Sequence, residues 1–244
     1  MRLSVLTDLG FDVQTQNHVE AVLVGDFPEP LRELCEVLAD FKMADIELVQ
    51  GGGGESHPTQ RLRRAFSERG WRKRNIEISK IVDGEHRAGT THEIDHVRQT
   101  DKGSIALEIE WNNKDPFFDR DLENFQRLHA EGAISVGIVI TRGQSLQDQM
   151  VQIIHDCALN NGVASFGDLT KFGLNPTARQ RKMVESGSGD FVATWAKKFV
   201  SDKFGSATTH WDKLKNRIER GVGNPCPLLL IGIPSTAVIK EDAR

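Results

Sequence analysis

Two short runs of alternating apolar and acidic residues hold the side chains best suited to chemistry. The runs, 92–97 and 105–111, are separated by a segment rich in turn formers, and this pattern predicts a β-hairpin. Side chains alternate between the faces of a strand, so Asp95 shares its face with the acid two residues earlier, and Glu108 shares a face with Glu110. Carboxylates crowded in this way raise one another's pKa and destabilise the fold unless a positive charge joins them. The hairpin therefore predicts a site for a divalent cation, and oxygen ligands suit Mg²⁺.

A second set of possible ligands overlaps the first run. The segment from His92 to His96 reads HEIDH and matches H-E-x-x-H, in which a helix presents two histidines to one zinc ion. On a strand the same two positions would lie about 13 Å apart, too far for one ion. The flanking residues favour a strand, and no third ligand follows at the spacing of the better-known zinc proteases. A zinc metallopeptidase remains an alternative function.

The acidic hairpin resembles the core of the PD-(D/E)XK nucleases, in which one strand supplies an aspartate and the next an acid-x-lysine pair. Here Asp95 is followed after twelve residues by Glu108 and then by Glu110, which stands where the commoner pattern has lysine. That departure is typical of the BamHI and BglII/BstYI restriction endonucleases. Three further segments look like the same branch, namely 115–132, 133–141 and 142–143. The resemblance is clearest over 75–150 and implies a type II restriction endonuclease.

The resemblance also implies roles for the acidic residues. It assigns Mg²⁺ binding to Asp95, Glu108 and the backbone carbonyl of Ile109. Glu110 would stand at the general-base or water-orienting position, and Glu77 would help to hold a second ion or a metal-bound water. Because position 110 is not lysine, the identity of the base stays open, with Lys114 or a substrate phosphate as alternatives.

Two loops and one basic cluster are expected to contact DNA. In the enzymes that the chain resembles, the loops after the second and third strands of the core enter the DNA interface. The residue types of these loops suit base contacts, because asparagine and glutamine pair with adenine and arginine pairs with guanine. Their expected contact residues are Asn112, Asn113, Lys114, Arg142 and Gln144. Seven basic residues between positions 61 and 74 stand against a single acid and are suited to tracking phosphates. The expected phosphate contacts among them are Arg61, Arg64 and Lys73.

The overall composition is that of an ordinary globular protein, with 38% hydrophobic and 27% charged residues. A net charge of −4 argues against a generally basic coat for nucleic acid, so the segregated cluster carries that prediction instead. No apolar run approaches the ~20 residues of a membrane span, and the N-terminus lacks the layout of a signal peptide. Three widely separated cysteines are expected to be buried and reduced. We expect a cytoplasmic protein that does not associate with membranes.

The periodicity predicts an α/β fold, with a mixed central β-sheet flanked by helices around the PD-(D/E)XK core. Helices are predicted at 28–43, 59–70, 115–132, 145–160, 190–204 and 209–220, and strands at 75–82, 92–97, 105–111, 133–141 and 228–233. We expect one restriction-endonuclease-like domain over 1–244. Its parts would be a nuclease core at about 57–162, an N-terminal helical part at 1–56 and a C-terminal helical extension at 163–244.

The acidic hairpin and the resemblance together imply a Mg²⁺-dependent type II restriction endonuclease that hydrolyses phosphodiester bonds in double-stranded DNA at a short palindromic site. One active site per chain and a target with two-fold symmetry require a homodimer. The interface could involve the helix predicted at 115–132 or the one at 145–160. Besides the zinc metallopeptidase, a non-catalytic DNA-binding protein on a nuclease fold remains an alternative.

Overall fold

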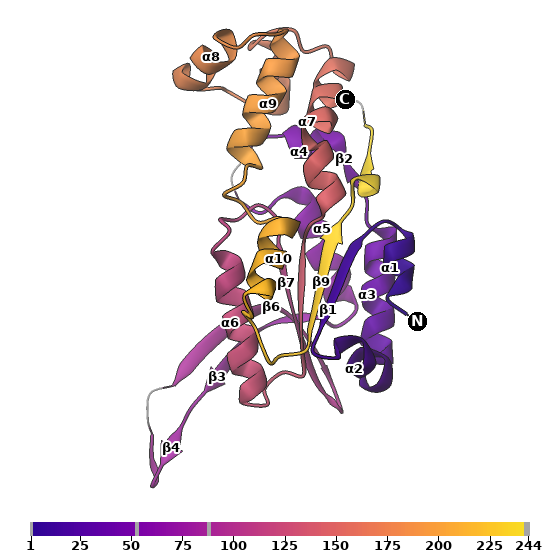
Figure 1. The fold of residues 1–244 in the computed structure, drawn as a ribbon, viewed down its shortest axis with the longest axis vertical. Helices are drawn as coiled ribbons and strands as arrows, with labels where there is room; N and C mark the ends of the chain where they lie inside the picture. The colour runs from indigo at the N-terminus through magenta and orange to yellow at the C-terminus, as the bar shows by residue number, and fades with distance from the viewer. Residues whose placement is uncertain (1, 52–53, 87–88, 242–244) are drawn as a thin grey trace.

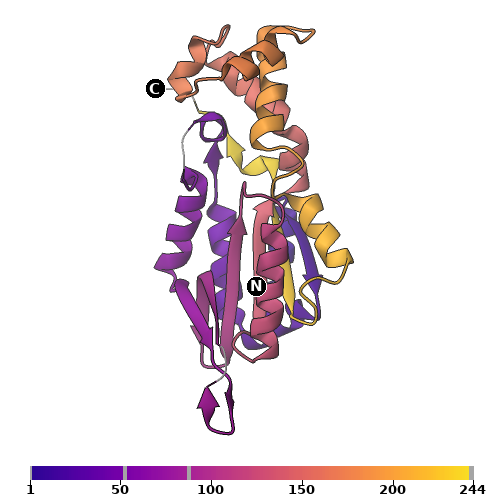
Figure 2. The same cartoon turned by 90° about the vertical axis from the view of Figure 1, so that its left-hand side faces the viewer.

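A six-stranded mixed sheet forms the centre of the molecule. The computed structural model describes residues 2–51, 54–86 and 89–241 (Figure 1). The strands lie in the order β1 (Asp12–Gln16), β9 (Leu228–Ile233), β8 (Val136–Arg142), β7 (Gly103–Glu110), β6 (Thr90–Thr100) and β3 (Arg72–Ile78). Helices flank this sheet, which confirms the predicted α/β class (Figure 2).

The direction of the strands changes across the sheet. β7, β8 and β9 run parallel to one another, while β6 and β3 on one side and β1 on the other are antiparallel to their neighbours. Every residue of β8 and β9 is buried, as expected for parallel strands covered on both faces. Strand β1 comes from near the N-terminus of the chain, and its neighbour β9 comes from near the C-terminus.

Alternating strand residues separate two hydrophobic cores on opposite faces of the sheet. In β7, Leu107 joins the larger core and Ala106 joins the smaller one. Helices with residues in the larger core include α1 (Ser4–Asp8), α2 (Val19–Asp26), α3 (Pro28–Asp40), α5 (His57–Glu68), α7 (Gln144–Asn160) and α9 (Phe191–Lys203). Those in the smaller core are α6 (Phe117–Ala130) and α10 (Trp211–Glu219). Helices α5 and α6 thus cover opposite faces of the sheet.

Helix α6 packs its Phe125 ring directly against a glycine of β8. A Cβ atom added to Gly137 would lie 2.5 Å from a ring carbon of Phe125, so a larger residue fits only if neighbouring side chains move. The close approach fixes α6 against the part of the sheet that carries the predicted acids.

The remaining elements extend the molecule beyond the two ends of the sheet. At the end drawn uppermost in Figure 1 are α4 (Asp45–Val49), η1 (Asp168–Phe172), α8 (Ala178–Glu185), η2 (Ser235–Ala237) and a small sheet of β2 (Met43–Ala44) and β10 (Val238–Ile239). At the other end, β4 (Ile81–Val82) and β5 (Glu85–His86) form a projecting hairpin. In the part of the chain that is described, no helix combines the length and apolar character needed to cross a membrane.

Two sequence predictions differ from the observed strands. The strand predicted at 75–82 ends at Ile78, and the following residues enter the projecting hairpin. The turn predicted between the acidic strands is much shorter, because β6 continues to Thr100 and β7 begins at Gly103. Arg98 lies in the segment predicted as a turn, but it extends strand β6. Its side chain donates a 2.8 Å hydrogen bond to the buried Glu33. All three cysteines are buried and unpaired, as predicted.

Candidate active site

The acidic hairpin divides into a fork where Asp95 and Glu108 lie. Backbone pairing of β6 with β7 reaches His96 opposite Leu107 and extends no further. At the next position, the backbone N–H of Asp95 lies 3.4 Å from the Glu108 carboxylate instead of facing a backbone carbonyl. The fork therefore places two carboxylate residues on adjacent strands at the point where those strands separate.

A β-bulge in β6 changes the direction of the Asp95 side chain. The residue pairs that flank the bulge are Arg72 with Val97 and Arg74 with Ile94. Between them, Asp95 and His96 together oppose the single residue Lys73. Ile94 and Val97 are buried in the same core, whereas the Asp95 side chain is 52% exposed. The bulge thus exposes one acid of the fork while its neighbours stay packed.

Three carboxylates are buried together, namely Glu108 of the fork and two others behind it. Glu108 and Glu110 of β7 are 5% and 3% exposed, and Asp121 of α6 is 1% exposed. Arg120 contacts Asp121 at 2.7 Å and Glu110 at 3.5 Å, and the Asn113 amide donates a 2.6 Å hydrogen bond to Glu110. Asp121 Oδ2 is buried and accepts no hydrogen bond from any described residue. Sequence reasoning missed Asp121, although an acid within the apolar stripe of an amphipathic helix is a detectable signal.

Burial and mutual repulsion raise the pKa values of these acids. Burial, followed by the charges of Asp121 and Asp95, raises the pKa of Glu108 well above its ordinary value. Burial and the neighbouring Asp121 raise the pKa of Glu110 to about 8. Burial also raises the pKa of Asp121. Arg120 is one cation beside three buried carboxylates, so the site has a deficit of positive charge.

The oxygen ligands and the charge deficit suit a divalent cation such as Mg²⁺. Within the described residues, no group of three or more histidine, cysteine or acidic side chains is arranged to hold an ion unaided. In general, Mg²⁺ binds one or two carboxylates and keeps several waters or substrate oxygens. The residues present therefore fit a metal shared between the protein, solvent and a phosphate.

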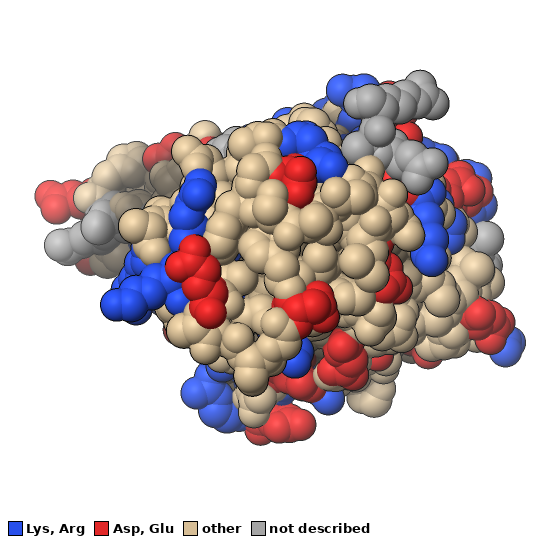
Figure 3. All heavy atoms as spheres, turned by 90° about the horizontal axis from the view of Figure 1, so that it is seen from above, with Lys and Arg blue, Asp and Glu red and all other residues tan. Residues whose placement is uncertain are grey.

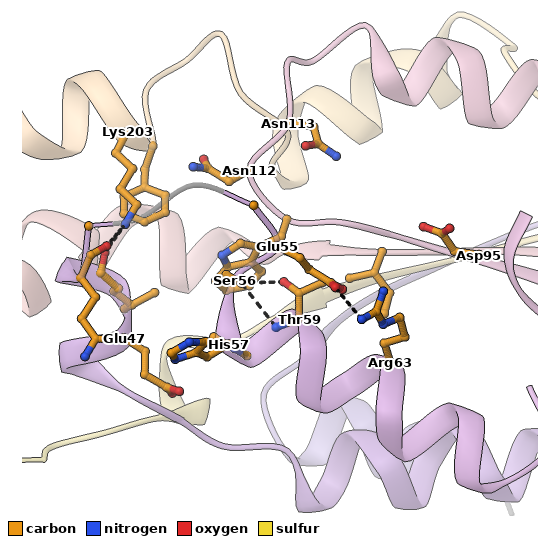
Figure 4. Close-up of a pocket in the computed structure, with 18 of the residues that line it drawn as sticks. Glu47, Glu55, Ser56, His57, Thr59, Arg63, Asp95, Asn112, Asn113 and Lys203 are labelled. Atoms are coloured by element: carbon orange, nitrogen blue, oxygen red, sulfur yellow. Dashed lines mark hydrogen bonds and ion pairs between the residues drawn. The ribbon is translucent and has the colours of Figure 1, made fainter. Parts of the chain in front are cut away.

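Two cavities meet at Asp95. The first has a volume of about 530 Å³ and is lined by Asp95, Trp111, Asn112 and residues around the start of α5. Figure 4 shows Asp95 at one end of this cavity and Lys203 at the other. The second has a volume of about 490 Å³ and follows α5 and β3, where its lining includes Arg63, Arg64, Arg72 and Lys73. Asp95 is thus accessible from a basic cavity.

The three residues predicted to contact phosphates differ in whether other residues of the protein already hold their side chains. Arg61 forms an ion pair with Glu47 and donates a 3.0 Å hydrogen bond to a backbone carbonyl, so it ties α5 to α4. Arg64 is exposed on the basic cavity. Lys73 contacts Glu93 at 2.6 Å and lies 4.0 Å from Asp95. Arg64 and Lys73 therefore line the cavity beside the fork, while Arg61 has a structural partner.

The loop after β7 is held by the segment before α10. The Asn113 N–H lies 3.2 Å from Thr209 Oγ1, and the Thr209 N–H donates a 2.8 Å hydrogen bond to the Asn113 carbonyl. Lys114 pairs with Thr208 as an isolated bridge, and its side chain is exposed. Asn112 faces the first cavity (Figure 4). Of the three loop residues, Asn113 is engaged with Glu110, which leaves Asn112 and Lys114 better placed for contact with DNA.

Arg142 does not lie on an exposed loop, so the predicted base contact is wrong for this conformation. It is the last residue of the fully buried strand β8 and is 0% exposed. Its guanidinium donates hydrogen bonds to Thr208 Oγ1 at 2.6 Å and to the Thr209 carbonyl at 2.7 Å, and it lies 5.0 Å from the ring centre of Phe204. Burial lowers the pKa of Arg142 to about 9. Arg142 thus anchors the segment that holds the loop after β7.

Among the described residues, Gln144 and Glu77 form no hydrogen bond or ion pair with the acids of the fork. Gln144 is the first residue of α7, where its side-chain amide donates a 2.9 Å hydrogen bond to Asp148. Glu77 is exposed on β3 opposite Thr91. It stands four residues beyond Lys73, which corresponds to about 13 Å along a strand. The structure does not bring Glu77 to the other predicted acids.

Comparison with known protein families agrees with this geometry. Residues 11–233 match the family described as restriction endonuclease BglII/BglIII. The chain belongs to this family. It is therefore a type II restriction endonuclease, a site-specific deoxyribonuclease whose substrate is DNA, and such enzymes typically use a divalent metal. A search of curated proteins found no match.

The match to the BglII/BglIII family includes the whole central sheet. It begins one residue before β1 and ends at Ile233, the last residue of β9. The resemblance inferred from 75–150 is confirmed, and its extent is greater than the motifs alone suggested.

The two histidines of the H-E-x-x-H segment face different surroundings in this BglII-family endonuclease. His92 Nδ1 lies 2.9 Å from the side-chain oxygen of Asn124 in α6. The His96 ring packs 5.8 Å from Phe66 in α5, and burial lowers its pKa. Since α5 and α6 cover opposite faces of the sheet, the two imidazoles do not converge on one ion.

Proposed function

We propose that this endonuclease uses Mg²⁺ held at the fork by Asp95, Glu108 and the backbone carbonyl of Ile109. The observation that carries the proposal is the separation of β6 and β7, which brings the Asp95 backbone within 3.4 Å of the Glu108 carboxylate beside an accessible cavity. Mg²⁺ bound there would neutralise phosphoryl oxygens and lower the pKa of the attacking water. Glu77 has no part in this proposal, because it lies at the opposite end of β3.

Glu110 is the residue best placed to accept a proton from water. It follows Glu108 by two residues in β7, so both side chains point to the same face. Asn113 and Arg120 contact the two oxygens of its carboxylate and fix its orientation. A pKa of about 8 indicates a carboxylate basic enough for this task, and a nearby cation would keep it ionised.

Double-stranded DNA would approach the fork along the basic cavity. Arg64 and Lys73 would contact phosphates, and Asn112 and Lys114 would lie near the bases or the adjacent backbone. At the end of the molecule that carries α8 and α9, basic and acidic residues are interspersed (Figure 3), so that end is less suited to a polyanion.

The symmetry of the reaction supports a homodimer acting at a short palindromic site. A single chain supplies one fork, and cleavage of both strands at a two-fold target requires two. The outer face of α6 or of α7 would supply the interface. In each subunit we treat 1–244 as one restriction-endonuclease-like domain, whose sheet takes a strand from each segment that flanks the 57–162 core.

Digestion of unmethylated plasmid DNA tests this proposal. With Mg²⁺ we expect discrete fragments whose sequenced ends share one short palindrome. Binding of DNA without cleavage in Mg²⁺, Mn²⁺ or any other metal would favour the non-catalytic alternative. Stoichiometric Zn²⁺ in the purified protein, lost in His92→Gln, would favour the metallopeptidase.

A further inference from the structure

We propose that Lys73 is a catalytic residue that contacts the scissile phosphate beside Asp95. The inference rests on the proposed function, because it takes the fork as the site of cleavage. It assigns to one lysine of β3 a role distinct from that of the basic residues that would track phosphates elsewhere.

The bulge places Lys73 at the fork. Asp95 and His96 occupy the space opposite Lys73, whereas every other paired residue of β3 faces one residue of β6. The Lys73 ammonium consequently lies 4.0 Å from Asp95 Oδ1. Bulges are frequent next to active sites because they redirect single side chains. A phosphate bound beside Asp95 would therefore be within reach of Lys73.

The present partner of Lys73 can be displaced by a phosphate. The ammonium contacts Glu93 at 2.6 Å, but the two side chains are 59% and 56% exposed. Exposed ion pairs contribute little to stability, so exchange of this pair for a phosphate contact costs little. The flexible stem of lysine allows the ammonium to move between Glu93 and a nearby phosphoryl oxygen.

When the Lys73 ammonium moves to the phosphate, it would offset the negative charge that develops there during cleavage. During hydrolysis the water oxygen forms a bond to phosphorus and its proton passes to Glu110. The bond from phosphorus to the leaving sugar oxygen breaks, and that oxygen keeps the bonding pair and takes a proton from solvent. Negative charge on the phosphoryl oxygens increases in the transition state, where a preplaced cation is most effective. Lys73 keeps its own proton throughout.

Of the described cations that line the cavities with Asp95, Arg63 forms a 3.0 Å ion pair with Glu55, whereas Lys73 lies 4.0 Å from Asp95. Arg120 is the cation nearest the buried acids, but its guanidinium is already shared between Asp121 and Glu110. Lys73 is the basic residue, among those described, that forms an ion-pair contact with Asp95. The geometry thus distinguishes Lys73 from Arg64, which lines the same cavity farther along α5.

The test separates catalysis from binding of DNA. With the target site mapped by digestion, a fluorescent duplex that contains it would be used at saturating enzyme. Lys73→Gln is expected to lower the single-turnover cleavage rate by about 100-fold, a typical loss for one transition-state contact. Its Kd for the same duplex without metal should stay within about threefold of the wild-type value, because one phosphate contact of many contributes little to affinity.

Two variants serve as controls and one tests the charge. Lys80→Gln removes an exposed lysine that contacts Glu131 at 3.4 Å away from the fork, and it should leave both the rate and the Kd unchanged. Glu93→Gln should retain cleavage, because Glu93 only holds the ammonium when DNA is absent. Lys73→Arg should recover part of the rate lost in Lys73→Gln.

Three results would overturn the assignment. One is wild-type single-turnover cleavage by Lys73→Gln, another is a rate loss explained wholly by a higher Kd, and the third is an equal rate loss in Glu93→Gln. If Asp95→Asn also cut normally, the proposed site itself would be wrong. If Asp95→Asn were inactive and Lys73→Gln fully active, only the role of Lys73 would fail.

Discussion

The buried carboxylates predict an unusual dependence of stability on pH. Glu110 has a folded-state pKa of about 8 against an ordinary value of 4.5. Between these values the folded protein holds a proton that the unfolded chain has released, so the free energy of unfolding decreases as pH rises. The interval of 3.5 pH units, at ~1.36 kcal/mol per unit, sets a ceiling of about 5 kcal/mol on the contribution of Glu110 to this loss. Relaxation of the site would make the measured loss smaller.

Urea unfolding of the metal-free protein from pH 4.5 to 8 measures this loss. In Glu110→Gln we expect the decrease to become smaller, because one of the three buried acids with a raised pKa is gone. Glu123→Gln is the matched control, since it removes an exposed acid of α6 and should retain the decrease. Saturating Mg²⁺ should oppose the loss at pH 8 by stabilising the ionised carboxylates. If the free energy of unfolding stays constant or rises over this pH range, the site does not hold more buried carboxylates than its cations can neutralise.

Three further predictions concern other parts of the account. Arg142→Met should lower the free energy of unfolding by about 2–4 kcal/mol in urea titrations, because it leaves the Thr209 carbonyl without its hydrogen-bond donor. A change below about 0.5 kcal/mol would contradict the anchoring role of Arg142. Asp121→Ala should raise the Mg²⁺ concentration needed for half-maximal cleavage, because it removes negative charge beside Glu110. If that Mg²⁺ concentration does not change, Asp121 is not part of the metal site. EDTA should abolish cleavage and excess Mg²⁺ should restore it, whereas 1,10-phenanthroline, which prefers zinc, should have little effect if the histidines of β6 bind no catalytic metal.

The sequence predicted most of the central sheet because its strands have strong local patterns. β8 and β9 are continuous apolar runs, and the stripe of α6 is regular from Phe118 to Leu128. β1 was missed because its residues, DVQTQ, are polar and only partly buried at the sheet edge. Its pairing with β9 joins residues far apart in the chain, and local periodicity contains no information about such a contact.

The candidate site was predictable in its acids but not in their arrangement. Spacing and resemblance together identify Asp95, Glu108 and Glu110. The bulge that exposes Asp95 depends on the register between β6 and β3, which the sequence does not specify. Arg142 was assigned to the surface because the residues after a strand usually form a loop. Its burial follows from the distant segment that contains Thr208 and Thr209.

Metal binding at the fork is the most direct test of the central claim. Mn²⁺ bound to the enzyme and a duplex with the mapped site can be counted by electron paramagnetic resonance, with Mg²⁺ as competitor. We predict that Asp95→Asn and Glu108→Gln each lose Mn²⁺ that the wild-type enzyme binds, while Glu77→Gln retains it. Undiminished Mn²⁺ binding in both Asp95→Asn and Glu108→Gln would contradict the proposed site.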